Sequence, residues 1–226
     1  MDWLAETRTS YDVVAHNYAE FVRGSLDRLP VLRSVLVMFA ELVRGSGPVL
    51  DLGCGPGQVT MFLQELGLDM VGIDLSPTMI EIAQRDYPGP RYEVGSMTNL
   101  SQGSDIAAGA LLFWSLIHVP DASVGVVLAE VFRVLRPGGI VSVGFHVGDR
   151  VNRKTEGYGG LPMQLNVHLR PVGAVAIALR EAGFSIESTS LLDPDHKTPG
   201  GVVVARRPTS TNHELVSHQR PSGSPR

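Results

Sequence analysis

The sequence predicts an α/β fold in which a doubly wound parallel sheet carries helices on both faces. Two observations lead to this prediction: short apolar runs, and segments with helical periodicity between them. Short apolar runs suit strands that are buried on both faces. Strands and helices that alternate through short connections specify right-handed crossovers and a parallel sheet. The runs cover residues 48–53, 69–75, 91–96, 108–117 and 139–145.

Two helices are predicted before the first run. Tyr11, Val14 and Tyr18 recur at spacings of three and four, which indicates an amphipathic helix with two tyrosines on its apolar face. A second helix is predicted over residues 29–43. We therefore expect residues 1–46 to form N-terminal helices that precede the sheet.

Two helices between the strands have clear start and stop signals. Ser76 and Pro77 supply an N-cap and a first-turn proline for one of them. Asp121 is expected to cap the other, which Pro137 and Gly138 end.

The alternation of strands and helices loosens after the fifth run. Residues 146–171 are rich in glycine and polar groups, and we expect them to form a substrate cap. A helix over residues 171–182 follows, and two final strands are predicted over residues 185–192 and 201–207. The last residues, 208–226, have no periodicity and are rich in Ser, Pro and Arg, which predicts a disordered tail.

Composition favours a small-molecule partner. The net charge is -4 and no stretch carries a run of like charges, so a nucleic-acid-binding surface is not indicated. The N-terminus is polar, and no apolar run approaches the roughly eighteen residues of a membrane span. The single cysteine, Cys54, excludes an intramolecular disulfide and a multi-thiolate metal site. We expect a cytoplasmic protein with no nucleic-acid or membrane partner, as a monomer or homodimer.

A glycine-rich turn follows the first predicted strand. Gly53, Gly55 and Gly57 would lie at the carboxyl edge of the sheet, where doubly wound folds bind ligands. A P-loop would need a lysine, which this turn lacks, and a dinucleotide fingerprint would need glycine at the position of Gln58. Asp51, two residues before the first glycine, would place a carboxylate near a pyrophosphate. The turn therefore favours a ligand that has a cationic group and no phosphate.

A second acid completes this pattern. Asp74 ends the second strand, about 20 residues after Gly53, where an acid can accept hydrogen bonds from both hydroxyls of a ribose. A ligand with a ribose, a cationic group and no phosphate is S-adenosylmethionine. Asp51 and Gln58 disfavour the alternative of a nicotinamide-dependent oxidoreductase.

The sequence resembles the class I S-adenosylmethionine-dependent methyltransferases, in particular the small-molecule branch grouped as methyltransferase types 11 and 25. The resemblance rests on five segments: DLGCGPG at 51–57, GIDLSPTMIEIAQ at 72–84, GSM at 95–97, SLIHVPD at 115–121 and VLRPGG at 134–139. It implies a Rossmann-like sheet of seven strands, mostly parallel with an antiparallel last strand. It also implies that residues 47–207 form the cofactor-binding domain and that the N-terminal helices form a lid over it.

The resemblance assigns S-adenosylmethionine to particular residues. Asp51 and the three glycines would hold its methionine portion, and Asp74 would bind its ribose. Ser96 stands where many relatives have Asp, so its contact with the adenine would be neutral and weaker by roughly 1 kcal/mol. The cofactor-binding residues implied are Tyr11, Tyr18, Asp51, Gly53, Gly55, Gly57, Asp74, Leu75, Met79, Ser96, Met97 and Trp114.

Three histidines are candidates for the catalytic group. His118 follows the fourth strand, His146 ends the fifth and His168 lies in the cap segment. Each could serve as a general base for an acceptor that must lose a proton, or could have a structural role. The spacing of His146, Asp149 and His168 matches no tight ligand pattern, so no metal site is predicted.

The resemblance predicts a methyltransferase that acts on a small organic molecule, with an oxygen or nitrogen acceptor favoured over carbon. The alternative is a protein of the same fold that binds S-adenosylmethionine and catalyses a non-methylating reaction or serves as a binding protein. The absence of an unambiguous base and the serine at position 96 are the features that keep this alternative open.

Overall fold

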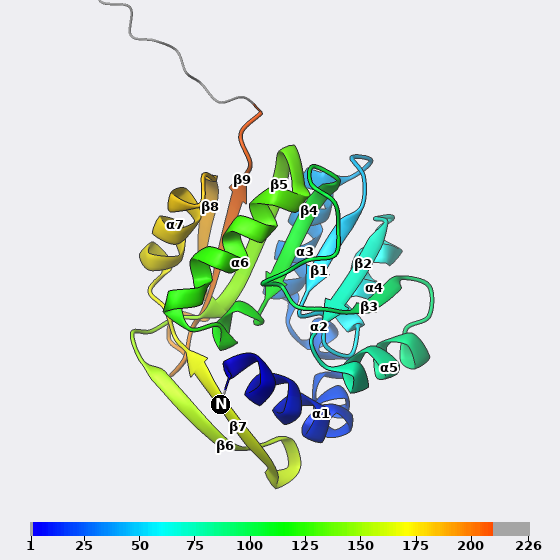
Figure 1. The fold of residues 1–226 in the computed structure, drawn as a ribbon, viewed down its shortest axis with the longest axis vertical. Coiled ribbons are helices and arrows are strands. Elements are labelled where there is room, and N and C mark those ends of the chain that lie inside the picture. The colour runs from blue at the N-terminus through cyan, green and yellow to red at the C-terminus, as the bar shows by residue number, and fades with distance from the viewer. Residues whose placement is uncertain (1, 210–226) are drawn as a thin grey trace, which may run out of the picture.

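A computed structural model describes residues 2–209 of the chain. Seven strands form one sheet, and β9 is antiparallel to both of its neighbours while the other adjacent pairs are parallel. The predicted seven-stranded, mostly parallel sheet with an antiparallel last strand is therefore confirmed (Figure 1). Across the sheet the strands are β3 (Arg91–Val94), β2 (Met70–Asp74), β1 (Val49–Leu52), β4 (Ala107–Phe113), β5 (Leu135–His146), β9 (Gly200–Arg206) and β8 (Ser185–Leu192).

Helices cover both faces of this sheet, as predicted (Figure 1). α3 and α4 pack buried side chains such as Phe39 and Leu63 against one face. α6 and α7 pack Val127, Val131 and Leu179 against the other face. The helices are α1 (Trp3–Val22), α2 (Ser25–Arg28), α3 (Pro30–Val43), α4 (Gln58–Glu65), α5 (Pro77–Asp86), α6 (Asp121–Val134) and α7 (Val172–Glu181), with short 3-10 helices η1 (Leu116–His118) and η2 (Tyr158–Gly160).

The two predicted helix starts have different outcomes. Ser76 is the N-cap of α5, and its hydroxyl accepts a hydrogen bond from the Met79 amide at 3.1 Å. Asp121 was expected to cap α6, and that prediction is wrong: Pro120 is the N-cap residue and makes no side-chain cap. The Asp121 carboxylate instead accepts two hydrogen bonds from Arg170, near the end of the cap segment.

The cap segment forms a hairpin separate from the main sheet. β6 (Val151–Gly157) and β7 (Leu161–His168) pair antiparallel, and α1 lies against β7 (Figure 1). β7 alternates buried and exposed side chains because one of its faces packs on α1 and η1. The hairpin and α1 together flank the carboxyl edge of the parallel strands. The predicted disordered tail lies outside the described residues, apart from Pro208 and Thr209.

No helix among residues 2–209 combines the length and the apolar character that a membrane crossing requires.

Candidate functional site

The turn from β1 into α4 has a backbone conformation that favours glycine. Gly53, Gly55 and Gly57 have φ angles of 79°, 54° and 91°, which lie in the left-handed region. A Cβ atom on Gly53 would lie 2.3 Å from the Cβ of Ser115, and one on Gly57 would lie 2.9 Å from the Cβ of Ala83. The turn therefore presents bare backbone at the carboxyl edge of the sheet, as the sequence predicted.

Asp74 ends β2 beside this turn, and backbone amides fix its carboxylate. Its Oδ2 accepts a hydrogen bond from the Gly55 amide at 2.8 Å, and its Oδ1 accepts one from the Ser76 amide at 2.9 Å. Burial raises the pKa of Asp74, and the amide donors oppose that shift. Each carboxylate oxygen can accept a further hydrogen bond. Asp74 is thus a rigid acceptor on the wall of a hollow.

This hollow lies between the carboxyl edge of the sheet and α1. Its volume is about 750 Å³, counted with the space at its open mouth. The structure brings most of the predicted site residues together on its walls. These are Tyr11, Tyr18, Gly53, Gly55, Asp74, Leu75, Met79, Ser96, Met97, Trp114 and His118.

Two predicted cofactor residues lie behind the turn and do not line the hollow. Asp51 is 2% exposed, and its carboxylate accepts a hydrogen bond from the Thr60 hydroxyl at 2.6 Å. Burial raises the pKa of Asp51 to about 7. Gly57 packs against Ala83 and Tyr92. The contact of Asp51 and Gly57 with the methionine portion stays a prediction.

His118 lies at the end of η1 and is hydrogen-bonded at both ring nitrogens. Its Nδ1 is 3.1 Å from the Asn166 carbonyl oxygen, and its Nε2 is 2.7 Å from the Tyr11 hydroxyl. Because a carbonyl oxygen can only accept, Nδ1 carries the proton, and Nε2 accepts the hydrogen bond that Tyr11 donates. Burial lowers the pKa of His118 to about 4, so the imidazole is neutral at pH 7.

The other two histidines do not line the hollow. His146 lies behind Trp114, whose indole Nε1 donates a hydrogen bond to the His146 Nδ1 at 3.3 Å. Trp114 has a φ of 52°, a strained conformation for a residue with a side chain, and its ring forms part of the wall. His168 is buried on the wall of a separate groove beside α6 and α7, and neither ring nitrogen has a partner among the described residues.

Comparisons with known proteins agree with this geometry. Residues 49–139 match the family described as "Methyltransferase domain". The chain is 31% identical to a malonyl-[acyl-carrier protein] O-methyltransferase of Pectobacterium atrosepticum over 46% of each chain. It is 34% identical to a ubiquinone biosynthesis O-methyltransferase of Azorhizobium caulinodans over 51% of this chain and 49% of that one. The chain spans about half the length of these curated relatives.

Solved structures share the fold. The 1,6-didemethyltoxoflavin-N1-methyltransferase of Burkholderia thailandensis, solved with S-adenosylhomocysteine, superposes with a TM-score of 0.72 at 22% identity. That alignment covers 91% of this chain and 89% of the other. Residues 49–139 thus match a methyltransferase domain, and solved structures that share the fold hold S-adenosylhomocysteine or S-adenosylmethionine.

The residues of the methyltransferase domain fit this cofactor. Gly53 and Gly55 leave a cradle that a Cβ atom at position 53 would fill, and Asp74 offers fixed acceptors for a ribose. The Ser96 hydroxyl on the same wall accepts a hydrogen bond from the Thr98 amide at 3.2 Å and lies 2.8 Å from the Thr98 hydroxyl. When it donates to that hydroxyl, its oxygen can accept one further hydrogen bond. The cofactor would therefore lie along the carboxyl ends of β1, β2 and β3.

Sequence reasoning missed the first turns of α1 as part of the site. The helix begins at Trp3, with Asp2 as its N-cap, well before Tyr11. Its residues that line the hollow are Trp3, Leu4, Thr7, Arg8, Tyr11 and Tyr18. Trp3, Thr7 and Tyr11 are spaced by four, which places them on one face of a helix, so this periodicity could have revealed the earlier start. We call α1 the lid helix because it covers the hollow.

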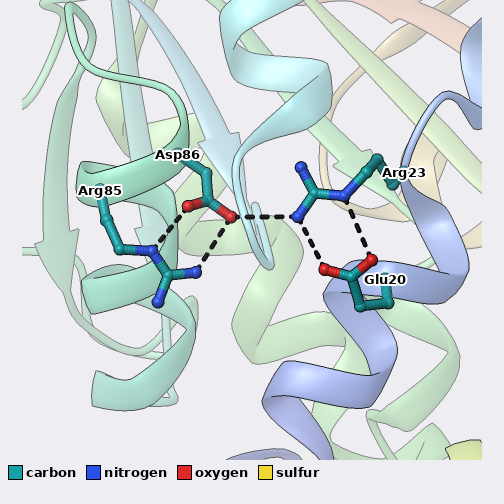
Figure 2. Close-up of polar contacts among 4 residues, drawn as sticks. All are labelled: Glu20, Arg23, Arg85 and Asp86. Atoms are coloured by element: carbon teal, nitrogen blue, oxygen red, sulfur yellow. Dashed lines mark hydrogen bonds and ion pairs between the residues drawn. The ribbon is translucent and has the colours of Figure 1, made fainter.

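Polar contacts hold the lid helix at several points along its length. Near its start, Glu6 pairs with Arg153 of β6 at 2.7 Å. In its middle, Asp12 accepts a hydrogen bond from the Ser76 hydroxyl at 2.5 Å. At its end, Arg23 bridges Glu20 and Asp86, and Arg85 also pairs with Asp86 (Figure 2). These contacts fix the lid helix between the hairpin and α5.

Proposed function

We propose that the protein transfers the methyl group of S-adenosylmethionine to an oxygen or nitrogen atom of a small organic acceptor. The observation that carries this proposal is the position of the Tyr11–His118 pair. The pair lies in the same hollow as the Gly53–Gly55 cradle and Asp74. A group that can accept a proton thus faces the place where the methyl donor would bind.

When bound, S-adenosylmethionine supplies an activated methyl group on a sulfonium. Asp74 would hold the ribose, and the Gly53–Gly55 backbone would hold the methionine portion. Ser96 and Met97 would lie at the adenine. Because the methyl group is already activated, the protein contributes mainly by placing the acceptor atom in line with it and by excluding water. The lid helix and the Trp114 ring close the hollow around that atom.

The proton of a hydroxyl or amine acceptor would leave through Tyr11 and His118. The Tyr11 hydroxyl, which donates its own hydrogen to Nε2 of His118, would accept a hydrogen bond from the acceptor. As the acceptor atom bonds to the methyl group, the bond from that carbon to the sulfonium sulfur would break, and the acceptor atom would become more acidic. The acceptor's proton would then pass to the Tyr11 oxygen, and the Tyr11 proton would pass to Nε2. Burial raises the pKa of Tyr11 well above its ordinary value, so the hydroxyl stays protonated between turnovers.

Two features support an oxygen or nitrogen acceptor. A carbon acceptor would need deprotonation before methyl transfer, and a buried imidazole with a pKa of about 4 is a weak base for that step. The relatives named O-methyltransferases and an N1-methyltransferase act, by name, on oxygen and nitrogen. As part of the same proposal, the protein works in the cytoplasm as a monomer or homodimer, and the single buried cysteine suits a reducing compartment.

Calorimetry with S-adenosylmethionine and S-adenosylhomocysteine tests the cofactor. Binding of both ligands is expected, and absence of binding at millimolar cofactor would overturn the proposal. A panel of phenols, carboxylic acids and amines, followed by mass spectrometry for a product heavier by one methylene, then tests the transfer. If an acceptor is converted without methylation and without release of S-adenosylhomocysteine, the non-methylating alternative holds instead.

A further inference from the structure

Arg170 follows β7 and buries its guanidinium beneath the turn that carries His118. The residue is 8% exposed. Its Nη1 donates to the Leu116 carbonyl at 3.0 Å, and its Nη2 donates to the Val119 carbonyl at 2.5 Å. Nε and Nη2 also donate to Oδ1 of Asp121 at 3.0 and 2.7 Å. A buried cation is costly unless it is paired and hydrogen-bonded, and this one is both.

The two carbonyl groups that Arg170 binds bracket His118. Leu116 begins η1, and Val119 follows its last residue. A 3-10 helix of three residues has little stability of its own and leaves carbonyl groups without helical partners. The guanidinium donates to the Val119 carbonyl and gives the Leu116 carbonyl a second donor beside the Val119 amide, so both ends of the turn are bound to one rigid, planar group.

The same hairpin strand also contacts the imidazole directly. The Asn166 carbonyl accepts the hydrogen bond from Nδ1 of His118, and Arg170 comes four residues later in the chain. The backbone amide of Arg170 in turn donates to the His146 carbonyl at 3.0 Å, which ties this segment to the end of β5. Residues 166–170 therefore hold the His118 turn at its backbone and at its ring.

We propose that Arg170 is a positioning residue that keeps His118 in the Nδ1–H tautomer with Nε2 directed at Tyr11 and the acceptor. This inference rests on the proposed role of His118 as the proton acceptor. Arg170 does not line the hollow, so it acts through His118 and not on the cofactor. Without the guanidinium, the Val119 carbonyl loses its hydrogen bond and the Leu116 carbonyl keeps only the Val119 amide, so the turn shifts and the hydrogen bond from Nδ1 to Asn166 is no longer enforced.

The test compares Arg170→Gln and Arg170→Lys with Arg180→Gln, a matched control on an exposed arginine of α7. Long-range proton–nitrogen NMR spectra at pH 7 report the tautomer of His118, whose signals are identified by their loss in His118→Gln. The natural protein and the control are expected to show only the Nδ1–H form. Arg170→Gln is expected to show both tautomers. With an acceptor that the natural protein methylates, its kcat should be lower by roughly 10- to 100-fold. The affinity for S-adenosylhomocysteine should stay within about twofold in all variants.

A folded Arg170→Gln variant that shows only the Nδ1–H tautomer overturns the inference. If Arg170→Gln does not fold, Asp121→Ala answers the same question, because Asp121 is 82% exposed on its side chain and its change removes Oδ1, the oxygen that accepts from Nε and Nη2 of the guanidinium. A mixed tautomer in Asp121→Ala supports the inference, and an unchanged one refutes it. Full activity of His118→Gln would refute the proposed proton acceptor, while the tautomer of the Arg170 variants would still report separately on the positioning role.

Discussion

The protein should lose stability in mild acid because His118 is buried as a neutral imidazole. The pKa of His118 is lowered to about 4 in the folded protein, against roughly 6.5 in the unfolded chain. Between these values the unfolded chain binds a proton that the folded protein does not, so the free energy of unfolding falls as the pH falls. At 1.36 kcal/mol for each pKa unit, the full loss is about 3 kcal/mol. The loss in free energy of unfolding between about pH 7 and pH 4.5 is about 2 kcal/mol.

Replacement of His118 by Gln isolates this contribution. The Gln variant should be less stable than the natural protein at pH 7, because it loses the ring that contacts Tyr11 and Asn166. At pH 4.5 the natural protein should have lost about 2 kcal/mol more than the Gln variant, because Gln does not titrate. The difference in unfolding free energy between the two proteins should therefore shrink by this amount or change sign. Other titrating groups are common to both proteins and cancel in the difference.

Urea unfolding at the two pH values measures both free energies. His16→Gln, a change of the same kind on an exposed face of α1, is the control and should track the natural protein at both pH values. A stability difference between natural protein and His118→Gln that stays constant to within about 0.5 kcal/mol would show that His118 is not held as a neutral, buried base.

Three further predictions concern the hollow. Asp74→Asn should weaken S-adenosylhomocysteine binding at least about tenfold, because an amide offers one acceptor where the carboxylate offers two; calorimetry tests this, with exposed Asp69→Asn as the control. Gly53→Ala should lower the free energy of unfolding by roughly 1–3 kcal/mol, because of its φ and the clash with Ser115; an unchanged urea midpoint would contradict the geometry of the cradle. Tyr11→Phe should lower kcat by roughly 100-fold with cofactor affinity nearly unchanged. Steady-state kinetics with an acceptor that the natural protein methylates check whether kcat alone falls.

The sheet, and the position of the glycine turn beside Asp74, could be predicted because their signals are local. Each apolar run indicated one strand, and the cradle and Asp74 follow directly after β1 and at the end of β2. Since parallel strands end at the same edge, the order of the strands was enough to bring these residues together. Asp51 shows the limit of that reasoning: the residue is correctly placed on β1, but its side chain turns away from the hollow and toward Thr60.

The Tyr11–His118 contact, on the proposed acceptor side of the hollow, could not be predicted because it joins residues that are distant in the sequence. Tyr11 and His118 are 107 positions apart, and they meet only because the lid helix packs against the hairpin. Which of the three histidines lines the hollow likewise depends on tertiary contacts. Each of them follows or ends a strand, so nothing in the local sequence distinguishes them. Asp121 failed as a helix cap for the same reason: Arg170, 49 positions away, is a stronger partner for its carboxylate than a backbone amide.

The lid helix carries Tyr11, one member of the pair through which the proton is proposed to leave. Its ends are held by exposed ion pairs, Glu6 with Arg153 and Arg23 with Asp86, which salt screens readily. Its middle is held by the hydrogen bond from Tyr11 to His118, inside the hollow. Because Tyr11 belongs to the lid helix, a displacement of this helix from the hairpin would also separate Tyr11 from Nε2 of His118. The proposed proton transfer therefore depends on the same packing that places the lid helix over the hollow.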